Sequence, residues 1–145
     1  MTVETAMARL RNLSSVREVQ QLESLESVLT ELARRDLTKE ECVALLNLFE
    51  RFPEDDAFGV FSSIVHLLEA QNGYEILLVD SVRRVPNEFN LSMVVSLING
   101  GFSHVGDVDL EELLQSVVDR PDVQPSAKQW AVEFLAHVRR GNQDF

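Results

Sequence analysis

The chain has 145 residues, of which 45% are hydrophobic and 26% charged, a balance that argues against intrinsic disorder and for one domain over residues 1–145. Thirteen basic and 24 acidic side chains give a net charge of −11, which disfavours binding to nucleic acid or to an anionic membrane and favours a basic partner protein. The single cysteine, Cys42, excludes an internal disulfide and a multi-cysteine zinc cluster.

The N-terminal segment shows no sign of a targeting signal. Residues 1–13 carry Glu4, Arg9 and Arg11 and contain no apolar run of signal-peptide length. No later segment approaches the roughly 20 apolar residues that a membrane-spanning helix needs. We therefore expect a cytoplasmic protein that does not enter a membrane.

Apolar residues recur at spacings of three and four along most of the chain, and sustained alternation with a period of two is rare. This pattern predicts an all-α fold. A helical region opens at residues 10–19. Ser15 and Glu18 then form an S-x-x-E capping box, in which each side chain can accept a hydrogen bond from a free backbone N–H, so a helix is predicted over residues 15–35.

A second capping box, Thr38 with Glu41, predicts that the next helix begins soon after the first and runs back along it as a helical hairpin. This helix is expected to end before Pro53, because proline disfavours helical geometry in the residue that precedes it. Glycine, proline and asparagine mark the later breaks. Five further helices are predicted, over residues 54–71, 74–85, 90–99, 109–119 and 126–141.

The predicted helices repeat along the chain. Alternate helices start about 35 residues apart, which is typical of helical hairpins stacked as a solenoid. We expect stacked helical hairpins that form a HEAT-like or irregular α-solenoid of about seven helices. A closed helical bundle is the alternative.

Residues that could carry chemistry are few. His66 and Glu69 lie three apart on one predicted helix, but no second histidine follows, and we interpret both as structural residues of the helical stack. Cys42 lies on an apolar stripe, which indicates packing. The glycines at 100, 101 and 106 lack the lysine and hydroxyl residue of a phosphate loop. The sequence predicts no catalytic residue, metal or cofactor; a hydrolase that uses His66 with carboxylates is a further alternative.

Acidic side chains concentrate in two segments, residues 40–56 and 105–122. Some lie at predicted helix N-termini, where the helix dipole favours carboxylates, but the excess of charge indicates a surface that attracts a basic protein. An aromatic side chain inside a charged rim is a typical anchor of tight complexes. The predicted partner-binding residues are Glu54, Asp55, Asp56, Tyr74, Phe102, Asp107, Asp109, Glu111 and Glu112.

A short apolar motif lies in the middle of the chain. Ile64-Val65-His66 is followed by Glu69, then by a helix that ends near Pro86 and by a helix that ends in Ile98-Asn99. In this arrangement residues 56–100 resemble the immunity protein 30 family of bacterial polymorphic toxin and contact-dependent inhibition systems. The resemblance implies that His66, Glu69 and Asn99 belong to a structural motif.

The same resemblance implies a small cytoplasmic antidote that binds one cognate toxin domain and holds it inactive. Many such toxins are nucleases, whose substrate-binding surface must be basic, so an acidic protein can cover that surface in place of nucleic acid. We therefore expect an immunity protein without catalytic activity that occludes its toxin. The alternative is a HEAT-like adaptor or scaffold protein that joins two cellular proteins.

Overall fold

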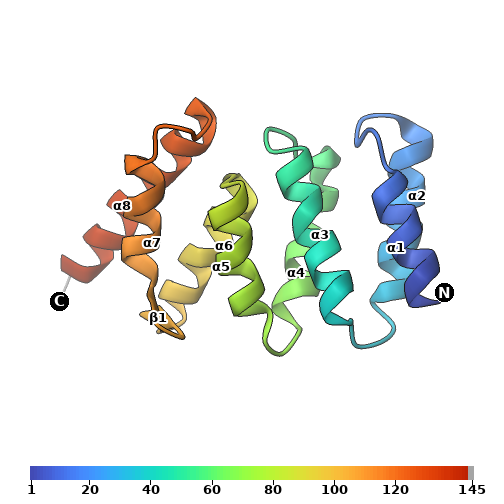
Figure 1. Cartoon of the computed structure of the whole chain (residues 1–145), viewed down its shortest axis with the longest axis horizontal. Helices are drawn as coiled ribbons and strands as arrows, with labels where there is room; N and C mark the ends of the chain where they lie inside the picture. The colour runs from blue at the N-terminus through green and yellow to red at the C-terminus, as the bar shows by residue number, and fades with distance from the viewer. Residues whose placement is uncertain (144–145) are drawn as a thin grey trace.

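The computed structural model describes residues 1–143 as a row of antiparallel helical pairs (Figure 1). This part of the chain contains eight α-helices, one 3-10 turn and one short β-hairpin. The all-α fold and its stacked hairpins are therefore confirmed. In chain order the elements are α1 (Val3–Asn12), α2 (Val19–Leu32), α3 (Lys39–Arg51), η1 (Ala57–Gly59), α4 (Val60–Glu69), α5 (Tyr74–Arg84), α6 (Glu88–Asn99), β1 (His104–Val105), β2 (Val108–Asp109), α7 (Leu110–Asp119) and α8 (Pro125–Gln143).

The helices form two layers. Helices α1, α3 and α5 pack side by side in one layer, and α2, α4, α6 and α8 follow one another in the other. Helix α7 packs mainly on α8, and the β-hairpin lies beside α5. The N-terminus and α8 lie at opposite ends of the row in Figure 1, so the stack is open and not a closed bundle.

Three phenylalanines join the two layers near the middle of the stack. Phe49 of α3 lies edge-on to Phe61 of α4, with ring centroids 5.1 Å apart, and stacks on Phe89 of α6 at 5.3 Å. Phe49 and Phe61 are fully buried. Cys42 is also buried, as its place on the apolar stripe predicted, and burial raises the pKa of its thiol.

Polar side chains tie each helical pair to the next. Arg51 donates to the carbonyls of Leu10 and Leu13 in the preceding pair. Arg84 donates to both oxygens of the Glu50 carboxylate, at 2.9 and 3.0 Å. The Glu50 and Arg84 partners are 34 residues apart in sequence, which is close to the repeat length that the helix starts predict.

The N-terminal helices differ from the prediction. Helix α1 begins at Val3, where Thr2 Oγ1 accepts a hydrogen bond from the Thr5 N–H, and it is the helix that raises the number from seven to eight. Helix α2 begins at Val19 and not at residue 15. Half of the capping box predicted there is formed: Ser15 Oγ accepts a hydrogen bond from the Glu18 N–H, but the Ser15 N–H donates to Gln21 Oε1 and not to Glu18. Ser15 Oγ also accepts from the N–H of residue 17, which closes a turn before the helix.

The segment predicted to open the helix at residue 54 is a strained turn. Asp55 and Asp56 accept hydrogen bonds from the N–H groups of Ala57 and Phe58, and these two residues have positive φ angles of 52° and 53°. The turn delays α4 to Val60. It also directs Phe58 outward, where its side chain is 64% exposed instead of packing on the apolar face of the helix.

The later helices differ in detail. Helix α6 begins at Glu88, two residues earlier than predicted, because Asn87 and Asn90 form a reciprocal capping box. Helix α8 begins at Pro125, one residue earlier than predicted, and Ser126 donates a hydrogen bond to Glu54. No helix within residues 1–143 combines the length and the apolar character needed to cross a bilayer.

Two carboxylates of the acidic segment 40–56 are withdrawn from the surface. Glu41 is fully buried and receives two hydrogen bonds from Arg35, while Glu50 is almost fully buried against Arg84 and Ser81. These charges are neutralised within the fold. The exposed acidic charge of this segment is therefore smaller than the sequence suggests.

Candidate functional site

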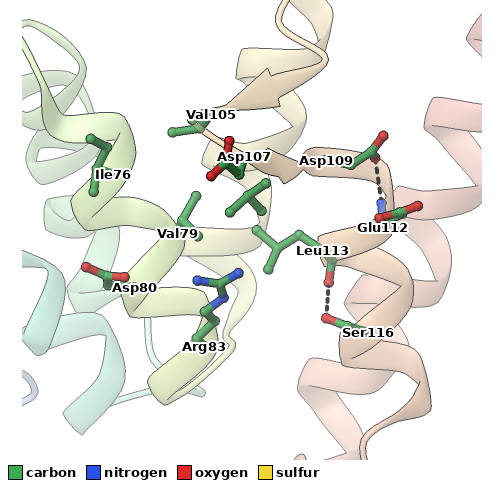
Figure 2. Close-up of a pocket in the computed structure, with 12 residues that line it drawn as sticks. Ile76, Val79, Asp80, Arg83, Val105, Asp107, Asp109, Glu112, Leu113 and Ser116 are labelled. Carbon is green, nitrogen blue, oxygen red and sulfur yellow. Dashed lines mark hydrogen bonds between the residues drawn. The ribbon is translucent and has the colours of Figure 1, made fainter.

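A groove opens between α5 and α7 and is closed at one end by the β-hairpin (Figure 2). Its volume is about 680 Å³. We call it the α5–α7 groove. Its floor is apolar, and its rim carries four carboxylates and one guanidinium. It is lined by Ile76, Val79, Asp80, Arg83, Val105, Gly106, Asp107, Val108, Asp109, Glu112, Leu113 and Ser116.

Local sequence rules explain how the three elements meet at the groove. On α5, Ile76, Asp80 and Arg83 are spaced by four and three residues and so share one helix face. The hairpin turns at Gly106, whose φ of 57° suits a residue without a side chain, and pairs Val105 with Val108.

Asp109 connects the hairpin to α7. Its Oδ1 atom accepts a hydrogen bond from the Glu112 N–H at 2.9 Å and so caps the helix. Its Oδ2 atom lies 3.5 Å from His104 Nε2 on the neighbouring strand. The carboxylate is therefore fixed at the corner where the hairpin and α7 meet.

The charges of the groove are arranged along its length. Asp107, Asp109 and Glu112 lie at the hairpin end, and Asp80 and Arg83 of α5 lie farther from the hairpin (Figure 2). At the end farther from the hairpin, Arg120 joins α7 to α5, because its guanidinium donates a hydrogen bond to the Arg83 carbonyl at 3.1 Å. The groove is thus acidic at its hairpin end and carries charges of both signs at the other end.

Two more predicted residues lie close by. Phe102, which is 48% exposed, and Glu111 line a smaller hollow of about 380 Å³, to which Asp109 also contributes. The structure therefore brings five predicted residues to one end of the molecule: Phe102, Asp107, Asp109, Glu111 and Glu112.

The other predicted acidic residues lie elsewhere. Glu54, Asp55 and Asp56 follow α3 in the middle of the row, on the edge of the stack opposite the hairpin (Figure 1). Burial raises the pKa of the Asp55 carboxyl, but hydrogen bonds from the Ala57 N–H and from Arg17 outweigh burial and leave that pKa lowered. The acidic segments form two separate surfaces, and no single surface combines them.

Tyr74 does not serve as an exposed anchor, because its side chain is only 7% exposed at the start of α5. Burial raises the pKa of its phenol to about 12, and the charges of Glu69 and Glu75 add to this effect. Its expected role in binding a partner is corrected to one in packing.

The pKa of Tyr74 gives a direct test of this burial. Because folding favours the neutral phenol, stability is complete below the ordinary pKa of 10.0 and falls as the pH rises toward 12. Tyr74 is the only tyrosine, so phenolate absorbance reports it alone. We expect a midpoint about two pH units higher in the folded protein than in denaturant, and a smaller alkaline loss of stability in Tyr74→Phe. Equal midpoints in the two states would show an exposed phenol.

Ile76, Asp80 and Arg83 were not predicted from the sequence as site residues. Ile76 is 62% exposed although it begins the apolar run Ile76–Val79. The sequence does contain a signal for a binding surface here, since these three residues share a helix face on which an apolar residue is followed by charges of both signs. What the sequence did not show is that this face meets α7 across a groove.

A second groove, of about 770 Å³, lies between α2 and α4 in the other layer. We call it the α2–α4 groove; exposed Phe58 and exposed His66 lie along it. No side-chain hydrogen bond of His66 is found within residues 1–143, so its expected role in bonding the helices is not observed. Glu69 is half-buried at the end of α4, and Asn99 is exposed at the end of α6.

No three His, Cys, Asp or Glu side chains of residues 1–143 are grouped so that they could hold a metal ion. Comparison of the chain with protein-family models, with curated proteins and with solved structures finds no match.

Proposed function

We propose that this protein is an immunity protein that binds a basic toxin domain in the cytoplasm and keeps it inactive. One observation carries the proposal: α5, the hairpin and α7 place four carboxylates around an apolar groove at one end of a helical stack. The resemblance of residues 56–100 to the immunity protein 30 family supplies the class of partner. A nuclease domain is the favoured toxin, because its working surface must be basic.

The groove combines the two properties that rapid and tight binding requires. Exposed carboxylates create a negative potential that attracts a basic surface over a distance and raises the rate of association. Apolar side chains such as Ile76 and Val79 then provide a desolvated contact inside the charged rim, where most binding energy is usually found. A toxin held in this way has its basic surface covered, so substrate is excluded without any chemistry by the immunity protein.

We test the proposal with the toxin domain encoded beside the gene. Co-expression should abolish toxicity, and the two proteins should co-purify. Asp107→Lys combined with Glu112→Lys should weaken the complex by about tenfold or more, because both carboxylates lie on the groove and like charges would then face each other.

The matched control is Glu4→Lys combined with Glu23→Lys on α1 and α2, where both side chains are exposed. It makes the same change in net charge far from the groove and should change the dissociation constant by less than about threefold, through long-range steering alone. A toxin that is neither bound nor inhibited by the wild-type protein would contradict the proposal, and equal losses in the two double variants would exclude the groove.

The adaptor function is the second candidate, and the α2–α4 groove is the observation that favours it. This groove lies in the layer opposite the α5–α7 groove, and exposed Phe58 beside it lies in strained backbone, a feature that often marks functional sites. An adaptor would hold two different proteins at once. Isolation of a complex with two partners, and without a toxin, would favour it over the immunity protein.

A further inference from the structure

The α5–α7 groove is closed in a way that limits what can occupy it. The β-hairpin forms one end, and at the other end Arg120 bridges α7 and α5 through the Arg83 carbonyl. A volume of about 680 Å³ is within the range of small-ligand sites. The groove therefore suits a few consecutive side chains of a partner, and it is too short for a long helix.

The floor of the groove selects an apolar residue at the centre of that segment. Val79, Val105 and Leu113 form a base that is almost fully buried. Ile76 stands beside them with 62% of its surface exposed, and removing this apolar surface from water is favourable. An aliphatic or aromatic side chain of the partner would cover it.

The charges fix the direction of the segment. The carboxylates of Asp107, Asp109 and Glu112 lie at the hairpin end and favour lysine or arginine there. Arg83 is the only cation among the residues that line the groove, and no carboxylate within residues 1–143 lies within 4.0 Å of its guanidinium nitrogens. An acidic side chain of the partner would pair with it.

We infer that the α5–α7 groove binds one short segment of the toxin in a fixed direction, with a basic residue at the hairpin, an apolar residue over Ile76 and an acidic residue at Arg83. This inference rests on the proposed function and goes further, because a general attraction between an acidic and a basic protein requires no direction.

Reversal of the charge at Arg83 distinguishes binding in a fixed direction from a general attraction between an acidic and a basic protein. In Arg83→Glu the protein becomes more acidic, so a general attraction to a basic toxin would become stronger. Fixed direction predicts the opposite: the dissociation constant should rise about tenfold or more, because two carboxylates would face each other. Arg83 is exposed and its hydrogen bond to Arg120 uses only the backbone carbonyl, so the fold should be kept, as circular dichroism can verify.

The matched control is Arg9→Glu on α1, an exposed arginine at the other end of the stack. It changes the net charge equally and should leave binding unchanged or slightly tighter. A second pair tests the apolar contact: Ile76→Ser should weaken binding by about tenfold, whereas Val132→Ser, at an exposed valine of α8, should not.

The results distinguish the inference from the proposed function. If the wild-type protein binds the toxin and Arg83→Glu binds it equally well or better, the fixed direction is overturned and the immunity function stands. If the wild-type protein does not bind the toxin, both are overturned. Weaker binding by Arg83→Glu and Ile76→Ser, with both controls unaffected, supports the directed segment.

Discussion

Replacing Phe49 by alanine should lower the free energy of unfolding by about 4 kcal/mol, the range measured when a buried phenylalanine is truncated. The ring is fully buried and contacts both Phe61 and Phe89. Its removal leaves a cavity where α3, α4 and α6 meet. Since a domain of this size is stabilised by only about 5–15 kcal/mol, the loss is a large fraction of the total.

The control is Phe58→Ala, which removes the same atoms from a ring that is 64% exposed. The Arg17 guanidinium carbon lies over the Phe58 ring, 5.1 Å from the ring centroid. Exposed cation–π contacts of this kind contribute about 0.5–1 kcal/mol to stability. Denaturant titration gives both values. Similar losses in the two variants would contradict the position of Phe49 in the core.

Two probes show whether the stack unfolds as one unit. Trp130, the only tryptophan, is in α8, which is joined to the Phe49 cluster through α6, whereas circular dichroism reports all helices. Stacked repeats interact mainly with their neighbours, and long arrays can lose cooperativity. In so short a stack we expect the Phe49→Ala variant to shift both transitions together. A shift in circular dichroism alone would show that α8 unfolds independently.

Much of the fold could be predicted because its signals are local. The Thr38–Glu41 capping box is confirmed, and helix α5 ends next to Pro86 as expected. Caps and prolines act within three or four residues, so the sequence contains all the information they need. The spacing of helix starts then extended this local pattern to a stack of hairpins.

The errors arose where distant residues decide the outcome. Glu50 was counted as surface charge because its partner, Arg84, belongs to the next helical pair. The β-hairpin was missed because strands of two residues are too short to show alternation. The turn at Ala57–Phe58 was missed because helical spacing continues through it, although the two aspartates bond the backbone in another geometry.

The candidate site was predicted in part for the same reason. Carboxylates that follow one another in sequence, such as Asp107 and Asp109, were identified together and do lie together. Their neighbours across the groove, Asp80 and Arg83, come from α5 and could be assigned only once α5 and α7 were placed side by side. The local sequence therefore identified the residues on the hairpin and α7 side of the groove, whereas the residues on the α5 side follow only from tertiary packing.

A second large effect is expected at Arg35. Its guanidinium donates to both oxygens of Glu41, at 2.7 and 2.6 Å, and Glu41 is fully buried. Arg35→Met keeps most of the apolar stem but leaves a buried carboxylate without its partner. Removing one member of a buried pair costs about 3–5 kcal/mol; because a third of the Arg35 side chain is exposed, we expect about 3 kcal/mol, the lower end of this range.

The control for this variant is the adjacent Arg34→Met. Arg34 is largely exposed and its nitrogen lies 3.5 Å from Glu31, a surface pair whose loss should cost less than about 0.5 kcal/mol. Thermal or denaturant unfolding at neutral pH compares the two variants directly. Equal costs at the two positions would show that Glu41 is hydrated and not buried.

The pH dependence identifies the cause of the loss. Hydrogen bonds from Arg35 lower the pKa of Glu41 below its ordinary value of 4.5, although burial opposes this. A lowered carboxyl pKa means that the pair stabilises the fold fully above pH 4.5 and that this contribution is lost as the pH falls through the lowered value. The deficit of Arg35→Met should therefore be largest near neutral pH and shrink in acid, because a protonated Glu41 no longer needs the guanidinium. A deficit that stays constant down to low pH would assign the loss to packing of the arginine stem.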